Sequence, residues 1–122
     1  MTKILYVEDN EDNIYMLTRR LKKKGIEIVI ANDGRQGVSK AKTEKPDLIL
    51  MDIMMPVMDG IEALKSIRSE VRLRSIPIVM LTSTTDIRMV TEAIECGAND
   101  YIAKPFSVTL LTERVERYVH AR

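Results

Sequence analysis

Several polar side chains follow directly after short apolar runs of this sequence. Carboxylates that meet within a few ångströms repel each other unless they share a proton or a cation. Oxygen ligands without His or Cys favour Mg²⁺ or a similar hard ion. An amine and a hydroxyl beside such a site would neutralise and orient a tetrahedral anion, so that one carboxylate could attack phosphorus. The side chains that suit this chemistry are Glu8, Asp9, Asp52, Thr82 and Lys104.

The apolar runs before these residues predict the elements that must position them. Short apolar runs bounded by polar or turn-forming residues are typical of strands. We expect strands over residues 4–7, 26–31, 48–51, 78–81 and 101–102. Between the runs, apolar residues recur at helical spacing, which predicts helices with one core-facing stripe each. The stripes are Ile14/Leu17/Leu21, Val38/Ala41 before Pro46, Ile61/Leu64/Ile67, Ile87/Val90/Ile94 and Leu111/Val115/Tyr118.

The alternation of strands and helices predicts an open α/β sheet of parallel strands with helices on both faces. The fully apolar run before Asp52 suits a central, buried strand. In such sheets, ligands bind at the carboxyl ends of the strands. Since the candidate residues all follow strands, we expect them to meet at this edge, with Asp52 standing where the chain leaves the core.

Composition limits the classes of protein to consider. The chain has 122 residues, the size of one domain, and its formal net charge of +1 gives no strong attraction to nucleic acid or an anionic membrane. Its single cysteine, Cys96, excludes an intrachain disulfide. No stretch approaches the about 18 apolar residues of a membrane span, and no signal peptide precedes the first acidic residues. We therefore expect a soluble, cytoplasmic domain.

The polar motifs form a set that has a known counterpart. They are VEDN (7–10), LILMD (48–52), MMPVMDG (54–60), MLTS (80–83) and GANDYIAKPF (97–106). On these motifs, residues 1–122 resemble the receiver domain of bacterial two-component response regulators. The resemblance implies a single receiver domain with a flavodoxin-like fold. That fold is a three-layer α/β/α sandwich around a five-stranded parallel sheet of order 2-1-3-4-5.

The resemblance also implies a metal site beside a phosphoacceptor. Asp52 matches the phosphoacceptor and a metal ligand, Asp9 matches a second ligand, and Glu8 assists through water. Met54 matches the position whose backbone carbonyl binds the metal. The implied ion is Mg²⁺, with Mn²⁺ as an alternative. Glu8 departs from the commonest pattern, which has Asp there, but its longer side chain still supplies a carboxylate.

Further positions match the family's switch and loop residues. Thr82 matches the switch hydroxyl, Tyr101 the switch aromatic, and Lys104 the lysine that contacts the phosphoryl group. The Lys104–Pro105 bond resembles a cis peptide that aims the amine inward. The residues with an expected structural role in the loops are Pro56, Gly60 and Pro105.

Two kinds of protein partner follow from the resemblance. A histidine kinase or a phosphotransfer protein would donate the phosphoryl group, and slow auto-dephosphorylation would end the signal. A downstream protein would bind residues 87–96, 100–103 and 107–120. We expect no direct contact with nucleic acid or membrane, and no catalysis beyond the chain's own phosphorylation and dephosphorylation. The chain is either a stand-alone regulator or a receiver taken from a longer protein.

The charge pattern argues against the dimer that some transcription-factor receivers form through this surface. Asp100 and Arg114 occupy two charged positions of that interface. Val90 and Leu110, however, stand where charges are expected. We therefore expect a monomer or a weak dimer.

Other interpretations compete for the same residues. Asn10 or Glu11, and less readily Asp9, could serve only to cap the helix that follows, because Asp and Asn are common N-caps. A flavin-binding protein would need small residues in place of the acidic segment EDNED, and a phosphatase of the haloacid dehalogenase type would need Asp in place of Met54. The main alternative is a pseudo-receiver, a protein-interaction module that phosphorylation does not regulate. Such modules normally lack part of the set of acids and lysine, which is complete in this sequence.

Overall fold

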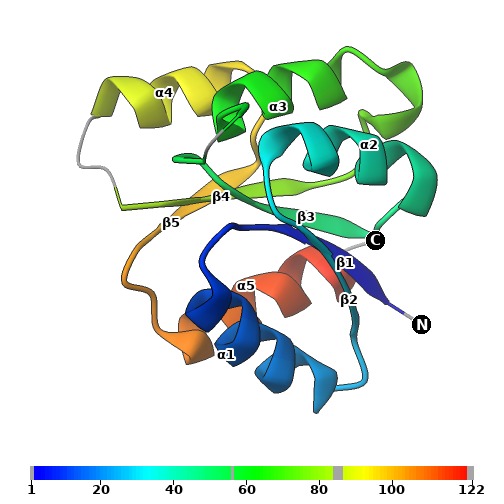
Figure 1. Cartoon of the computed structure of the whole chain (residues 1–122), viewed down its shortest axis with the longest axis vertical. Helices are drawn as coiled ribbons and strands as arrows, with labels where there is room; N and C mark the ends of the chain where they lie inside the picture. Colours follow the sequence, from blue (N-terminus) through cyan, green and yellow to red (C-terminus); the bar gives the residue numbers. More distant parts are fainter. Residues whose placement is uncertain (1, 56, 84–86, 121–122) are drawn as a thin grey trace.

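The computed structural model describes residues 2–55, 57–83 and 87–120, along which strands and helices alternate (Figure 1). The strands are β1 (Lys3–Val7), β2 (Glu27–Ala31), β3 (Leu48–Asp52), β4 (Ile78–Thr82) and β5 (Asp100–Ala103). The helices are α1 (Glu11–Lys22), α2 (Gly34–Glu44), α3 (Gly60–Arg68), α4 (Ile87–Glu95) and α5 (Val108–His120), with a short 3₁₀ helix, η1 (Val71–Leu73). Every predicted strand is present, and within the described residues only η1 adds to the predicted helices.

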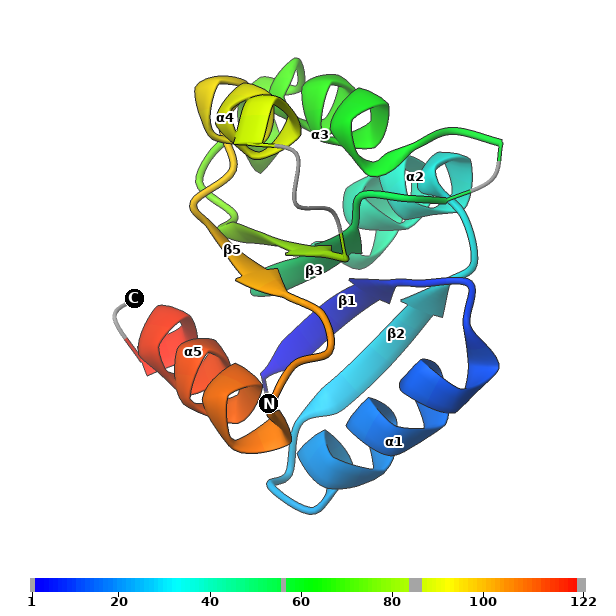
Figure 2. The same ribbon diagram turned by 90° about the vertical axis from the view of Figure 1, so that its left-hand side faces the viewer.

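All the strands pair in parallel in one sheet of order β2-β1-β3-β4-β5 (Figure 2). This confirms the order 2-1-3-4-5. Strand β3 pairs with β1 on one side and with β4 on the other, so Asp52 ends a central strand. Every residue of β3 and β4 is buried, as expected for uninterrupted apolar runs in the middle of a parallel sheet.

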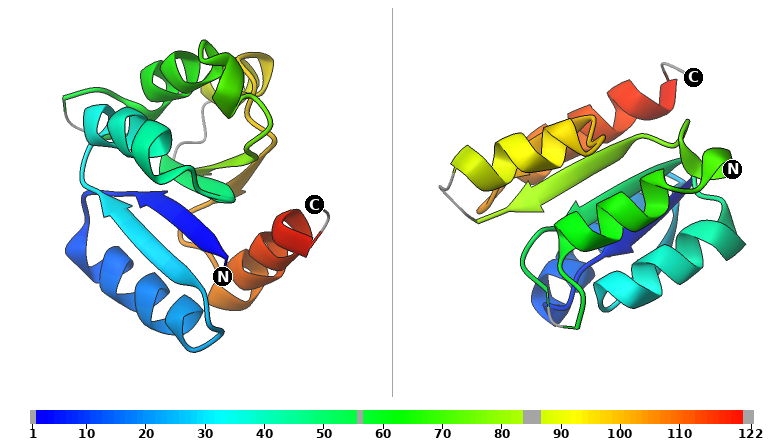
Figure 3. Two further views of the ribbon diagram at one scale, coloured as in Figure 1. Left: turned by 90° about the vertical axis from the view of Figure 1, so that its right-hand side faces the viewer. Right: turned by 90° about the horizontal axis from the view of Figure 1, so that it is seen from above.

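Helices cover both faces of the sheet and complete a three-layer sandwich (Figure 3). Side chains along a strand alternate between the two faces. In β1, Leu5 and Val7 pack with residues of α2, α3 and α4, whereas Ile4 and Tyr6 pack with residues of α1 and α5. Among the helices of the described residues, none combines the length and the apolar character needed to cross a bilayer.

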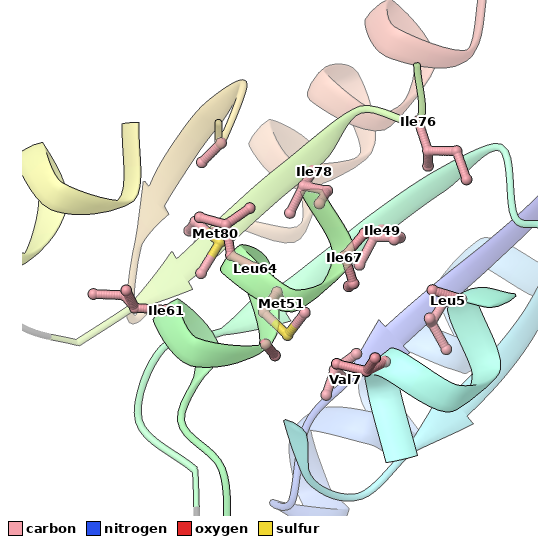
Figure 4. Close-up of a cluster of buried hydrophobic side chains, with 14 of the residues drawn as sticks. Leu5, Val7, Ile49, Met51, Ile61, Leu64, Ile67, Ile76, Ile78 and Met80 are labelled. Carbon is pink, nitrogen blue, oxygen red and sulfur yellow. The ribbon is translucent and has the colours of Figure 1, made fainter. Parts of the chain in front are cut away.

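The core under α3 fixes the strand that ends in Asp52. Figure 4 shows this cluster of buried side chains. Leu64 and Ile67 of α3 belong to it together with Ile49 and Met51 of β3. Full burial of each such side chain stabilises the fold by about 1.5–3 kcal/mol. The position of Asp52 is therefore set by packing along the whole strand before it.

Short polar side chains begin several helices. Asn10, Asp33 and Asp59 each accept a hydrogen bond from the backbone N–H three residues later, at 2.9, 2.8 and 2.9 Å respectively. The N-cap of α1 is thus Asn10, one of the three residues for which the sequence allowed capping, and not Glu11 or Asp9. Helix α2 ends at Glu44, just before Pro46, as predicted.

Candidate functional site

The carboxyl edge of the sheet gathers the candidate residues. Asp52 and Thr82 end β3 and β4, and Glu8 and Lys104 directly follow β1 and β5. The backbone N–H of Glu8 donates to the carbonyl of Ala31 at 2.9 Å, so Glu8 continues the ladder of β1. The backbone N–H of Lys104 donates to the carbonyl of Thr82 at 2.7 Å. The strand ladders therefore fix the backbone positions from which these side chains reach one another.

Carboxylates of three residues converge at this edge. One oxygen from each of Glu8, Asp9 and Asp52 lies within 4.8 Å of the others. Glu8 is fully buried, Asp52 is 5% exposed and Asp9 is exposed, so the cluster opens to solvent on the side of Asp9. Carboxylate oxygens are hard ligands of the kind that Mg²⁺ prefers. The residues present therefore fit a divalent metal ion.

Lys104 brings a cation into the acidic cluster. Its ammonium lies 2.8 Å from Oε1 of Glu8 and 3.1 Å from Oδ2 of Asp52, and its side chain is 16% exposed. The peptide bond between Lys104 and Pro105 is cis, as expected from the sequence. An amine at this depth, bridging two carboxylates, is also placed to contact an anion bound to either one.

The charges of the cluster shift its pKa values in opposite directions. Burial, together with the neighbouring Glu8, raises the pKa of Asp52 to about 6. Burial also opposes ionisation of Glu8, but hydrogen bonds with Lys104 and Asp52 outweigh it and lower the pKa of Glu8. The same carboxylates raise the pKa of Lys104 against the effect of its burial. In the metal-free site, Glu8 is thus the ionised partner of Lys104, and Asp52 is the carboxylate whose charge is hardest to accommodate.

Most of the chain matches a known protein family. Residues 4–116 match the model described as the response regulator receiver domain. The chain belongs to the receiver domain family. The match extends from β1 into α5 and includes every strand end at which the acids, Thr82 and Lys104 stand.

Curated relatives of this receiver domain are longer regulators. The alkaline phosphatase synthesis transcriptional regulatory protein PhoP of Bacillus subtilis is 40% identical over 114 residues, which make up 93% of this chain and 47% of that protein. The DNA-binding response regulator MtrA of Mycobacterium tuberculosis is 39% identical over 113 residues, 93% of this chain and 48% of that protein. The chain thus spans about half the length of the curated relatives it matches.

Solved receiver structures share the fold over nearly their full length. The chemotaxis protein CheY4 of Vibrio cholerae superimposes with a TM-score of 0.90 and 34% identity, covering 97% of this chain and 98% of that chain. The receiver domain of the sensor histidine kinase PA1611 from Pseudomonas aeruginosa gives a TM-score of 0.89 and 34% identity, with 98% of each chain covered. The PA1611 structure contains a magnesium ion coordinated in its active site cleft.

The expected switch residues of the receiver lie on neighbouring strands. The register of β4 and β5 pairs Thr82 with Ala103 and Met80 with Tyr101. Thr82 is buried at the acidic edge, whereas the side chain of Tyr101 is 47% exposed. The structure therefore brings Thr82, but not Tyr101, to the acidic edge. Tyr101 stands further back on β5, at the surface of the outermost strand.

The loop after Asp52 gives a physical reason for the glycine that ends it. A Cβ at Gly60 would lie 2.3 Å from the carbonyl oxygen of Asp52, so a larger residue could not begin α3 this close to the end of β3. Within the loop, Val57 has a left-handed conformation with φ of 69°, which is rare for a β-branched residue. Pro56, which the sequence analysis assigned a role in stiffening this loop, lies outside the described residues.

Tyr6 belongs to the site, although the sequence did not predict it there. Tyr6 is fully buried, and its hydroxyl donates a hydrogen bond of 3.1 Å to Oε1 of Glu8. Burial, followed by the charge of Glu8, raises the pKa of Tyr6, so the phenol keeps its proton and acts as the donor. From the sequence, Tyr6 is expected only as part of the apolar strand 4–7. The available signal was its spacing of two residues from Glu8, which puts both side chains on one face of the strand.

Proposed function

We propose that this receiver domain is a phosphoacceptor switch and that Asp52 accepts the phosphoryl group. The observation that carries the proposal is the bridge from Lys104 to Asp52 and Glu8 inside the acidic cluster. A phosphoryl group on Asp52 adds negative charge to a site that is already acidic. A partly buried ammonium 3.1 Å from the Asp52 carboxylate offsets part of that charge and gives the phosphoryl oxygens a donor.

The transfer is a nucleophilic displacement at phosphorus. A carboxylate oxygen of Asp52 forms the new bond to phosphorus, the bond to the imidazole nitrogen of the donor breaks, and that nitrogen keeps the electron pair. When bound, Mg²⁺ or Mn²⁺ neutralises charge on the transferring oxygens. Asp9 and Asp52 would hold this ion with the backbone carbonyl of Met54, and Glu8 would assist through water. Later, water attacks the phosphorus slowly, the bond between phosphorus and the Asp52 oxygen breaks, and inorganic phosphate leaves while the carboxylate is restored. The domain therefore processes only itself and is no enzyme in the ordinary sense.

The phosphoryl group biases the conformation of the edge. Its oxygens accept a hydrogen bond from Thr82 and pair with Lys104, which draws the end of β4 toward Asp52. Tyr101, half-exposed on β5, can then turn inward, because its ring favours burial while its hydroxyl favours water. The signal therefore reaches the surface through β4 and β5.

A downstream protein binds the surface formed by residues 87–96, 100–103 and 107–120. This surface exposes apolar side chains that a soluble monomer has no reason to display together. Ile87 at the start of α4 is 77% exposed. Ile94, Tyr101 and Leu110 are exposed on the same three elements.

The same surface does not favour a strong dimer. Arg114 of α5 lies 2.6 Å from Asp100 of β5 in the same chain, and Tyr118 donates to the same carboxylate at 3.1 Å. Asp100 therefore already has partners within one chain. We therefore expect a monomer or a weak dimer. We also expect no direct contact with nucleic acid or membrane.

The phosphoryl donor is a histidine kinase or a phosphotransfer protein of the cytoplasm. The family supports a kinase partner, because receiver domains act in two-component systems. We assign residues 1–122 to one receiver domain. The functions of the longer relatives are not carried over, since the chain matches only about half of each.

The alternative is a pseudo-receiver that binds partners without being phosphorylated. Incubation with a small phosphodonor such as acetyl phosphate and Mg²⁺, followed by intact-mass measurement, separates the two. A phosphoacceptor gains the mass of one phosphoryl group in the presence of Mg²⁺. It shows no gain in mass when Mg²⁺ is chelated before the donor is added. A chain that gains no mass under conditions that label a known receiver is a pseudo-receiver.

A further inference from the structure

Tyr6 connects the apolar core to the acidic edge. It is fully buried among residues that face α1 and α5. Glu8 stands two residues further along the same extended backbone, so both side chains lie on this face. The tyrosine ring is long enough to bring its hydroxyl to 3.1 Å from Oε1 of Glu8. A buried hydroxyl without a partner is costly, and Glu8 supplies the acceptor.

Protein donors surround the carboxylate of Glu8. Its Oε1 accepts from three side chains, one in β1, one in α1 and one just after β5, and its Oε2 accepts from the backbone at the start of the loop that follows. A carboxylate offers about four lone-pair positions, so these contacts use its full capacity. The donors are Tyr6 Oη at 3.1 Å, Lys104 Nζ at 2.8 Å and Asn13 Nδ2 at 3.4 Å to Oε1, and the N–H groups of Asp9 at 3.2 Å and Asn10 at 3.3 Å to Oε2.

Asp52 is held less completely than Glu8. Its Oδ1 accepts from the N–H of Met54 at 3.3 Å, and its Oδ2 accepts from Lys104 at 3.1 Å. Asp9 is exposed and opens the cluster to solvent. Lone pairs that can turn toward a cation therefore belong mainly to the two aspartates, whereas Glu8 is directed toward Lys104.

We propose that Tyr6 is a positioning residue: its hydroxyl holds Glu8 in the orientation that tethers Lys104 and keeps the Glu8 carboxylate from binding the metal ion directly. The inference rests on the proposed phosphoacceptor function for the role of Lys104, but the orientation of Glu8 is a property of the site itself. Without the hydroxyl, the Glu8 carboxylate can turn toward a cation held by the aspartates. Lys104 then loses part of the support that places it against Asp52.

The freed Glu8 carboxylate and the less ordered Lys104 have opposite effects: one raises the affinity for Mg²⁺, and the other lowers the rate of phosphorylation. An additional carboxylate oxygen near the cation strengthens Mg²⁺ binding. A less ordered Lys104 slows transfer of the phosphoryl group to Asp52. A substitution that merely loosened the edge of the sheet would weaken Mg²⁺ binding and slow transfer together, so the signs distinguish positioning from a general structural role.

The test compares Tyr6→Phe with the parent and with Tyr15→Phe, which removes the same hydroxyl from an exposed tyrosine of α1. The Mg²⁺ dissociation constant is measured by titration, and the phosphorylation rate is measured with acetyl phosphate at saturating Mg²⁺. For Tyr6→Phe we expect Mg²⁺ to bind about twofold to fivefold more tightly and phosphorylation to slow by about threefold to tenfold, the range expected for loss of one hydrogen bond. Tyr15→Phe should match the parent in both.

A second background shows whether Tyr6 acts through Glu8. In Glu8→Gln the carboxylate is absent, so adding Tyr6→Phe should change the Mg²⁺ dissociation constant by less than about 1.5-fold, as a double-mutant cycle requires of coupled residues. Weaker or unchanged Mg²⁺ binding in Tyr6→Phe, or an equal effect of Tyr6→Phe in both backgrounds, would overturn the inference. If the parent binds Mg²⁺ but is never phosphorylated, the proposed function fails, and the Mg²⁺ titrations still decide the role of Tyr6.

Discussion

Replacing Asp52 by Asn should stabilise the metal-free receiver at neutral pH. In the parent, burial and the neighbouring Glu8 raise the pKa of Asp52 from 3.8 to about 6, so its ionised form is unfavourable in the folded chain. The folded state therefore binds this proton more tightly than the unfolded state does. It follows that the parent loses stability as the pH rises from about 4 to about 6. The amide of Asn carries no charge and can still accept a hydrogen bond from Lys104.

The size of the effect follows from the pKa shift. A change from 3.8 to about 6 corresponds to about 3 kcal/mol at about 1.36 kcal/mol per pKa unit. This is an upper limit, because Lys104 loses one charged partner in the variant. We expect Asp52→Asn to be more stable than the parent by about 1–3 kcal/mol at about pH 7.5, and the gain to vanish below about pH 4, where Asp52 is protonated in both states.

Urea unfolding in the presence of EDTA, repeated across this pH range, measures the effect. Asp33→Asn is the matched control, because it removes one carboxylate outside the cluster and Asn caps a helix as well as Asp does. The control should show no comparable gain. A variant at position 52 that is less stable than the parent at neutral pH, or whose gain is the same at all pH values, would refute the charge repulsion described for this site.

Three further substitutions test separate parts of the site. Asp9→Ala should weaken Mg²⁺ binding by at least about tenfold, since the ion loses a directly bound carboxylate; an unchanged affinity in titrations would remove Asp9 from the metal site. Thr82→Ala should still be phosphorylated, but beryllofluoride with Mg²⁺ should no longer shift the NMR signals of Tyr101 and residues 87–96; shifts equal to those of the parent would show that the signal leaves by another route. Gly60→Ala should lower the free energy of unfolding by about 1–3 kcal/mol, because its Cβ would meet backbone atoms of Asp52. If urea unfolding gives the variant the same free energy of unfolding as the parent, that steric contact is contradicted.

The sequence predicted the fold well because its signals are local and repeated. Each strand is an apolar run, each helix carries a stripe, and the alternation of the two leaves few topologies. The position of Asp52 at the end of a buried strand follows from the same pattern. The cap of α1 illustrates the limit of such signals, because the sequence allowed Asn10, Glu11 or Asp9 in that role, and only the hydrogen bond that the N–H of Asn13 donates to Asn10 decided among them.

Contacts between distant segments could not be predicted in the same way. The hydroxyl of Tyr6 was hidden by the apolar character of its strand. Arg68 of α3 donates to the carbonyl of Leu73 at 3.0 Å, which ties α3 to η1. It also donates to the carbonyl of Gly97 at 2.9 Å and to the side chain of Asn99 at 3.0 Å, which ties α3 to the segment between α4 and β5. Two of these acceptors are backbone carbonyls, which every residue carries, so they cannot be predicted from the residue types in the sequence.

The chemical identity of the phosphorylated residue tests the central claim most directly. After incubation with acetyl phosphate and Mg²⁺, reduction with borohydride converts an aspartyl phosphate to homoserine, which peptide mass spectrometry then locates in the chain. We predict homoserine at position 52 in the parent and no phosphoryl mass gain in Asp52→Asn. Homoserine at position 9 or 59 with none at 52, or undiminished phosphorylation of Asp52→Asn, would contradict the assignment of Asp52 as the phosphoacceptor.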